Sequence, residues 1–274
     1  MSDLFAYPFM VHALEAGTIV AVLAAEVGWY MVLRRQSFAG HTLSVMAFPG
    51  AAGAALAGLP VTLGYYLACG AAALAIAPSR RQRRGGYVSE TAAIGTVQVT
   101  GLALGYLFLS LNHGILGGLE TLLFGTFLGI SAGQVIGLLV VAAVALLALA
   151  VVGRPLLFAT VDPEVAGARG VPVRALDAGF LLILALAVAA TSQITGALLV
   201  FALLVAPPAT AQLITRRTLA GLALSIAIAL LIVWLGLVVA YYSIYPVGFY
   251  ITTFAFGAYV LTRFAIHVHA RLRP

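Results

Sequence analysis

The sequence contains no lysine, and all 14 of its basic residues are arginine. A nucleotide-binding loop of the G-x-x-x-x-G-K-[ST] type needs its lysine to hold the phosphates, so this class of ATP site is excluded from the chain. ATP hydrolysis, if the protein depends on it, must take place on another chain. The single cysteine, Cys69, excludes intramolecular disulfides and cysteine zinc clusters, and its apolar surroundings favour a buried packing role.

Charge is also scarce, since 8% of the residues are charged and 63% are hydrophobic. Soluble domains carry roughly one-quarter charged residues, so this composition and a mean hydropathy of +1.13 indicate a polytopic membrane protein. The net charge of +6 is then explained by arginines that collect on the cytoplasmic side of the bilayer, and we expect no nucleic-acid partner. The N-terminal stretch has no basic residue before Arg34 and lacks the positive region of a signal peptide, so we expect its first apolar segment to be retained as a span.

Apolar runs separated by charge, glycine and proline predict a single membrane domain, residues 1–274, of the all-α class with about nine transmembrane helices. The predicted spans are 13–33, 38–59, 61–77, 91–111, 134–152, 178–192, 195–213, 219–241 and 247–266.

The sixth and seventh spans could instead form one long helix over 178–205. If Thr191–Gly196 is an outer turn, all 14 arginines fall on one side of the membrane, whereas one long helix would place five of them outside. We therefore expect nine spans in a prokaryotic plasma membrane, with the N-terminus outside and the C-terminus in the cytoplasm. Pro207 and Pro208 are expected to break the seventh span.

The outer face is then free of arginine and attracts cations. It carries a small set of acidic and imidazole groups: Asp3, His12, Glu15, His113 and Glu120. His113 and Glu120 either pass a metal inward or are solvated loop residues. We expect the segment 112–133 to be an outer loop with an interfacial helix.

The longest polar connection, 153–177, contains the stretch "DPEVAGARGVP". Asp162 is a good N-cap, Pro163 suits the first helical position, and Glu164 favours the positive end of the helix dipole. Gly170 can adopt the left-handed cap that ends a helix. The pattern predicts a helix of roughly seven residues that rests on the chain's own span ends or docks on another protein.

Three stretches resemble the permease subunits of ABC importers for divalent metal ions, the zinc, manganese and iron family. They are "VLRRQSFAGHTL" to "FPG" (32–50), "RPLLFATVDPEVAGARGVPV" (154–173) and "ITGALLVFALLVAPPATAQLI" (194–214). The resemblance implies a type II importer permease that forms a homodimer, with two ABC ATPase subunits inside and a metal-binding receptor outside. It implies a divalent metal as the substrate, ATP bound by the partner ATPase, no cofactor and no catalysis in this chain. Residues 153–177 become a cytoplasmic coupling loop, in which we expect six residues to serve contact with the ATPase: Asp162, Pro163, Glu164, Ala166, Gly167 and Gly170.

The second span departs from the family pattern, because His41 stands where the resemblance places an aspartate and Val45 where it places a histidine. His41 either touches the metal or hydrogen-bonds neighbouring backbone at a helix end. Thr42 and Ser44 either offer oxygen ligands or fill helix contacts. Glu15 and Glu26, eleven residues apart, lie about 20° from the same helix face, and we consider them as a cation ladder or as separate interfacial and buried groups.

Two alternatives to a permease for free metal ions remain, one in the cargo and one in the class of function. The cargo could be a metal chelate, since both expected ligands are substituted. A proton-coupled secondary transporter that uses Glu15, Glu26 and His41 as a relay is a different class of function. An intramembrane enzyme is disfavoured by the absence of H-E-x-x-H and G-x-S-x-G motifs. His267 and His269 are expected to belong to a basic cytoplasmic tail.

Overall fold

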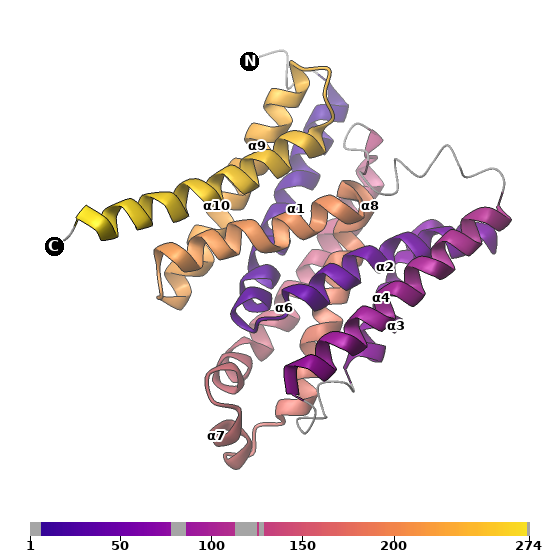
Figure 1. Cartoon of the computed structure of the whole chain (residues 1–274). Helices are drawn as coiled ribbons and strands as arrows, with labels where there is room; N and C mark the ends of the chain where they lie inside the picture. The colour runs from indigo at the N-terminus through magenta and orange to yellow at the C-terminus, as the bar shows by residue number, and fades with distance from the viewer. Residues whose placement is uncertain (1–6, 78–85, 113–124, 126–128, 273–274) are drawn as a thin grey trace.

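The computed structural model describes residues 7–77, 86–112, 125 and 129–272, and this part of the chain is helical with no strand. Figure 1 shows the helices in order along the chain. They are α1 (Pro8–Leu33), α2 (Ser37–Leu56), α3 (Val61–Ile76), α4 (Gly86–Leu111), α6 (Ala132–Val161), α7 (Pro163–Ala168), α8 (Val173–Ile214), α9 (Thr218–Tyr241) and α10 (Val247–Leu272).

Each of the nine expected spans overlaps a helix. Within the described residues, six helices are long and apolar enough to cross a bilayer. The expected spans 38–59, 61–77 and 195–213 are the helices α2, α3 and Leu199–Ile214, which are shorter or less apolar. The all-helical membrane fold is thus confirmed, whereas the count of nine membrane crossings stays a prediction.

Helix α1 lies in the middle of the bundle and packs against α6, α8 and α9. Two of its carbonyl groups accept hydrogen bonds from neighbouring helices. Ser225 Oγ of α9 donates to the carbonyl oxygen of Ala25 at 3.2 Å, and Gln212 Nε2 of α8 donates to that of Trp29 at 2.9 Å. Inter-helix hydrogen bonds of this kind supplement van der Waals packing where lipid replaces water. The C-terminal half of α1 is therefore fixed to both of these helices.

Helix α8 changes course at Gly196, whose backbone angles (φ 74°, ψ 161°) are not helical. Such angles belong to a region used almost only by glycine. The expected outer turn over Thr191–Gly196 is therefore wrong in extent, because the helix continues through Thr195. The hydroxyls of Thr191 and Thr195 donate to carbonyl oxygens four residues earlier at 2.7 and 2.9 Å, so these buried groups need no water.

Pro207 and Pro208 do not break the second half of α8, which contradicts the prediction. Proline lacks the N–H that would bond the carbonyl four residues earlier, so Pro208 leaves the Leu204 carbonyl without its helical donor. Gly28 of α1 lies directly against that carbonyl, and a Cβ at this position would collide with it. The close approach of α1 covers the exposed backbone and helps the helix to continue.

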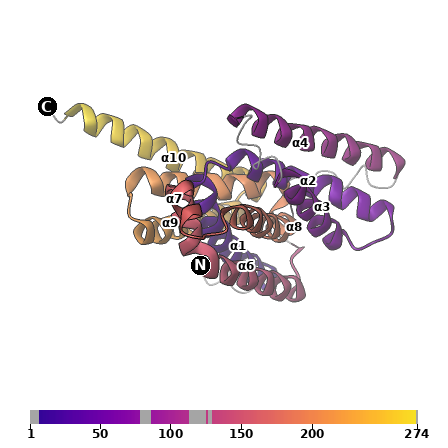
Figure 2. The ribbon, with the colours of Figure 1, turned by 90° about the horizontal axis from the view of Figure 1, so that it is seen from below.

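Helices α2, α3 and α4 form one side of the molecule, and Figure 2 shows α4 at its edge beside α2 and α3. Gly50 of α2 and Gly64 of α3 meet backbone to backbone, with no room for a Cβ on either. Small residues allow membrane helices to approach in this way. The C-terminal part of α10 projects away from the rest of the bundle (Figure 2).

Helix α6 runs to Val161, nine residues beyond the expected end of the fifth span. Pro155 lies inside it without ending it, and Thr160 Oγ1 donates to the carbonyl oxygen of Leu156 at 2.6 Å. Helix α8 begins at Val173. The expected coupling loop 153–177 therefore begins and ends as helix, and the true connection is Asp162–Pro172 with α7 inside it.

Candidate coupling site and metal path

The start of α7 is closed by Asp162. This residue has extended backbone angles, and its carboxylate accepts hydrogen bonds from the backbone N–H groups of Glu164 and Val165 at 3.1 and 3.0 Å. Pro163 occupies the first helical position, and Glu164 lies in the first turn. The predicted N-terminal cap is confirmed.

The end of α7 is closed by backbone alone. Gly170 has a φ of 81°, and its N–H donates to the Gly167 carbonyl at 3.0 Å, while the Val171 N–H donates to the Ala166 carbonyl at 3.0 Å. This pair of bonds is a Schellman motif, which satisfies carbonyl groups that the helix end would leave open. The predicted cap at Gly170 is confirmed, and a helix of six residues is fixed at both ends.

The two faces of α7 differ. The Ala166 side chain is fully buried, where α7 contacts α6 and α8. Glu164, Val165 and Gly167 are exposed, and nothing lies within 4 Å of a Cβ placed on Gly167. Of the six residues expected to serve contact with an ATPase, Ala166 is buried where α7 meets the chain's own helices, and the contact with an ATPase stays a prediction.

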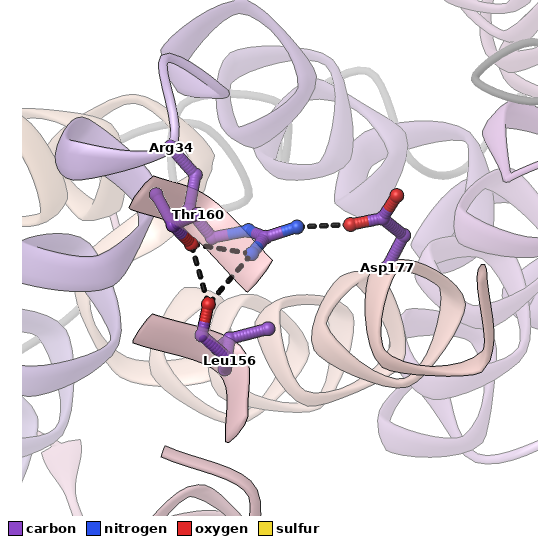
Figure 3. Close-up of polar contacts among 4 residues, drawn as sticks. All are labelled: Arg34, Leu156, Thr160 and Asp177. Carbon is purple, nitrogen blue, oxygen red and sulfur yellow. Dashed lines mark hydrogen bonds and ion pairs between the residues drawn. The ribbon is translucent and has the colours of Figure 1, made fainter. Parts of the chain in front are cut away.

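Arg34, at the end of α1, joins the two helices that flank α7 (Figure 3). Its guanidinium forms an ion pair with Asp177 of α8 and donates to Thr160 Oγ1 of α6 at 2.7 Å and to the Leu156 carbonyl at 3.5 Å. The guanidinium also lies 5.4 Å from the centre of the Phe180 ring. We call Arg34, Leu156, Thr160 and Asp177 the arginine clamp.

The arginine clamp lies in a protected place, with the Arg34 side chain only 5% exposed. Further hydrogen bonds offset part of the cost of a buried ion pair, and Thr160 and Leu156 accept such bonds from the Arg34 guanidinium. In the sequence, Arg34 and Arg35 lie in a stretch that carries the family resemblance, and Asp177 is a lone acid at the end of the polar connection. Nothing in the sequence predicts that Arg34 and Asp177, 143 residues apart, are in contact.

His41 lies in the second turn of α2, half-buried, with its ring 4.8 Å from the ring of Phe201 in α8. Its Nδ1 is buried and has no hydrogen-bond partner among the described residues. The nearby hydroxyls are engaged within the bundle. Thr42 Oγ1 donates to Gln98 Oε1 of α4 at 3.0 Å, and Ser44 Oγ donates to the His41 carbonyl at 2.7 Å.

Glu15 is exposed on the N-terminal half of α1, where it lines a groove of about 1110 Å³ between α1, α6 and α9. His12 lines the same groove, with its Nδ1 3.2 Å from the Ile130 carbonyl oxygen. Glu26 is half-buried further along α1. Among the described residues no three histidine, cysteine or acidic side chains gather into a metal site, so Glu15, Glu26 and His41 do not form one cluster in this chain.

The remaining candidates are not part of any described site. His113 and Glu120 lie outside the described residues, as does most of the expected interfacial segment. His267 and His269 are exposed on the projecting end of α10, where they join no candidate metal site.

The chain is similar to known membrane transport proteins in both sequence and structure. A family model described as the ABC 3 transport family matches residues 6–266. The manganese transport system membrane protein MntC of Halalkalibacterium halodurans is 32% identical over 215 residues, which cover 78% of this chain and 73% of MntC. The chelated iron transport system membrane protein YfeC of Yersinia pestis is 34% identical over 226 residues, which cover 82% of this chain and 75% of YfeC. The solved structure of PsaBC from Streptococcus pneumoniae in complex with Fab matches with a TM-score of 0.83 and 26% identity, over 95% of this chain and 93% of that chain.

Proposed function

Because the chain belongs to the ABC 3 transport family, we propose that it is the membrane permease subunit of an ATP-driven importer for manganese or chelated iron. The cargo follows the names of the two relatives, a manganese and a chelated iron transport protein. The observation that carries the proposal is α7, a capped helix with an open outer face whose flanking helices are tied to the bundle.

ATP is bound and hydrolysed by separate ABC ATPase subunits, because this chain has no lysine for a nucleotide-binding loop. The exposed face of α7, which includes Glu164, Val165 and Gly167, seats in the ATPase. Closure of the ATPase dimer then pushes on α7 and shifts the permease between conformations that face opposite sides of the membrane. A ligand shifts such an equilibrium only through unequal contact with the two states, and α7 is where that contact is made.

The assembly consists of two copies of this chain with the path between them, two ATPase subunits in the cytoplasm and a metal-binding receptor outside. The N-terminus faces outward and the C-terminus the cytoplasm of a prokaryote, since this orientation places all 14 arginines on the inner side. The exposed apolar side chains of α4 and α10, such as Tyr106 and Phe256, are covered by lipid or by the second copy.

His41 is the candidate metal ligand of this chain. Its buried Nδ1 lacks a hydrogen-bond partner among the described residues, and in the tautomer that carries the proton on Nε2 this nitrogen has a lone pair for a transition metal. Imidazole suits zinc and iron, whereas manganese prefers oxygen ligands, so His41 by itself does not identify the cargo. Zinc is the weaker candidate because neither relative compared above is named for it.

A metal chelate is the second candidate cargo. The described residues hold no group of three metal-binding side chains, and a chelate brings most of its metal ligands with it. Competition between free Mn²⁺ and chelated iron in an uptake assay separates the two cargoes, since only the true cargo will compete at low concentration.

Replacement of Gly167 by tryptophan tests the docking role of α7. The site is open, so Gly167→Trp should leave the fold intact while placing a bulky ring on the proposed docking face. The ATPase should then fail to co-purify with the variant. Gly137→Trp is the matched control, because Gly137 is equally open but lies at the far end of α6. If Gly167→Trp retains the ATPase as well as Gly137→Trp does, α7 is not the docking helix.

A further inference from the structure

Three helices that bear on α7 are joined by one side chain. Helix α6 leads into α7, α8 leads out of it, and Arg34 at the end of α1 contacts Thr160 and Leu156 of α6 together with Asp177 of α8. Figure 3 shows the guanidinium between the two helices, with a nitrogen directed to each. The arginine clamp therefore closes the connection Asp162–Pro172 into a loop with fixed ends.

The two junctions of α7 are the weak points of this connection. Asp162 has extended backbone angles (φ −142°, ψ 92°), and the four residues 169–172 after α7 are not helical. A force applied to α7 would bend these junctions if the ends of α6 and α8 could separate. The arginine clamp prevents that separation, because the guanidinium binds both helix ends at once.

We propose that Arg34 is a positioning residue that carries the displacement of α7 to α1, an inference that rests on the proposed function. When α7 moves, the ends of α6 and α8 move with it as one body, and Arg34 takes the end of α1 along. In this role Arg34 transmits force and contacts neither the cargo nor ATP.

The displacement has a route onward from α1. The Trp29 carbonyl, five residues before Arg34, holds Gln212 in the second half of α8. This same helical segment carries Phe201, whose ring packs on His41. A movement of the α1 end thus reaches the candidate metal ligand through packed groups, which is the kind of contiguous network that transmits coupling between distant sites.

The end of α1 is rigid enough for this role. Arg35 has a φ of 56°, which is unusual for a residue other than glycine, and its N–H donates to the Val32 carbonyl at 3.0 Å. The Gln36 N–H donates to the Met31 carbonyl at 2.9 Å. The helix is closed by this tight turn directly after Arg34, so backbone hydrogen bonds fix the position from which the Arg34 side chain starts.

The test measures manganese ions transported per ATP hydrolysed, in proteoliposomes that contain the permease, its co-purifying ATPase and Mn²⁺. Asp177→Asn removes the charge of the partner, and we expect the ratio to fall about tenfold, within the ~5–150-fold range typical of coupling between sites. The amount of bound ATPase should stay unchanged, because the exposed face of α7 is intact. Arg154→Gln is the control, since Arg154 is an exposed arginine of the same region of α6 outside the arginine clamp.

Asp177→Asn leaves Arg34 buried beside a neutral group, so the variant could lose stability. Two double variants keep the test decisive. The apolar pair Arg34→Met with Asp177→Leu leaves no buried charge and should fold, yet remain uncoupled. The reversed pair Arg34→Asp with Asp177→Arg restores the attraction and should recover part of the coupling.

A wild-type transport ratio in the apolar pair would overturn the proposal, because the arginine clamp would then serve folding alone. Loss of the ATPase from the apolar pair would also contradict it, since the clamp would then shape the docking face. If the wild-type chain itself transported Mn²⁺ without any ATPase, the proposed function would fail together with the role of the clamp.

Discussion

Arg34 and Asp177 form an ion pair between the end of α1 and the start of α8, although 143 residues separate them in sequence. The guanidinium is nearly buried, and Thr160 and the Leu156 carbonyl occupy other N–H groups. Removal of one member of a buried pair typically costs about 3–5 kcal/mol, because the remaining charge is left without compensation. Under the proposed function, this contact is where a displacement of α7 would reach α1.

The N-terminal cap of α7 should matter for docking. Asp162→Ala removes the acceptor for two backbone N–H groups, and loss of an N-cap costs about 1 kcal/mol of helix stability. Because 1.4 kcal/mol corresponds to tenfold, affinity for the ATPase should fall about fivefold. Amide hydrogen exchange over 163–168 should also become faster. Asp162→Asn keeps an acceptor oxygen and should behave almost as wild type; equal effects of the two changes would contradict the capping role.

The contact between α2 and α3 should be sensitive to a single methyl group. Gly64→Ala places a Cβ against the Gly50 carbonyl, and such overpacking costs about 1–3 kcal/mol. We expect a lower Tm in detergent. Gly70→Ala is the matched control in the same helix, because nothing lies within 4 Å of a Cβ there. A similar Tm for both variants would show that α2 and α3 do not meet at Gly50 and Gly64.

The bend in α8 should depend on glycine. Gly196→Ala forces a side chain into backbone angles that are essentially restricted to glycine, at a cost of about 1–3 kcal/mol. Gly179→Ala, in a regular and open part of α8, should be neutral or slightly stabilising. Thermal unfolding of the two variants distinguishes them, and equal stability would mean that the chain at position 196 is regular helix.

The imidazole of His41 should be needed for metal transfer. His41→Phe keeps a ring against Phe201 but removes both nitrogens. Changes around metal ligands commonly cost 10–100-fold, so we expect ATP-driven Mn²⁺ uptake to fall by about tenfold or more. Association with the ATPase should be unaffected, since His41 is not part of α7. Wild-type uptake by this variant would remove His41 from the metal path.

The sequence was sufficient to predict the class of fold and the local form of α7. The small share of charged residues indicated a helical membrane protein, and each predicted span overlaps a helix of the structure. The caps at Asp162 and Gly170 could be predicted because they depend on near neighbours only, through an acceptor side chain and a residue that tolerates positive φ.

Features that depend on distant contacts could not be predicted in this way. The placement of the arginines favoured an outer turn at Thr191–Gly196, but the helix continues through Thr195, because the hydroxyls of Thr191 and Thr195 bond preceding helical carbonyls and lie buried. Pro208 indicated a helix break, whereas Gly28 from another helix covers the carbonyl that it frees. The partner of Arg34 likewise follows from packing of α1 against α8. The three candidate metal residues were chosen by residue type and helical face, and the described residues do not gather them into one site.

Mn²⁺ uptake into proteoliposomes, measured with ATP and with a proton gradient as separate energy sources, tests whether the chain is an ATP-driven permease. Uptake should occur only when the ATPase and ATP are both present, and it should be lost in Gly167→Trp but not in Gly137→Trp. Uptake by this chain alone, driven by a proton gradient and unaffected by Gly167→Trp, would contradict the proposed function and identify a secondary transporter instead.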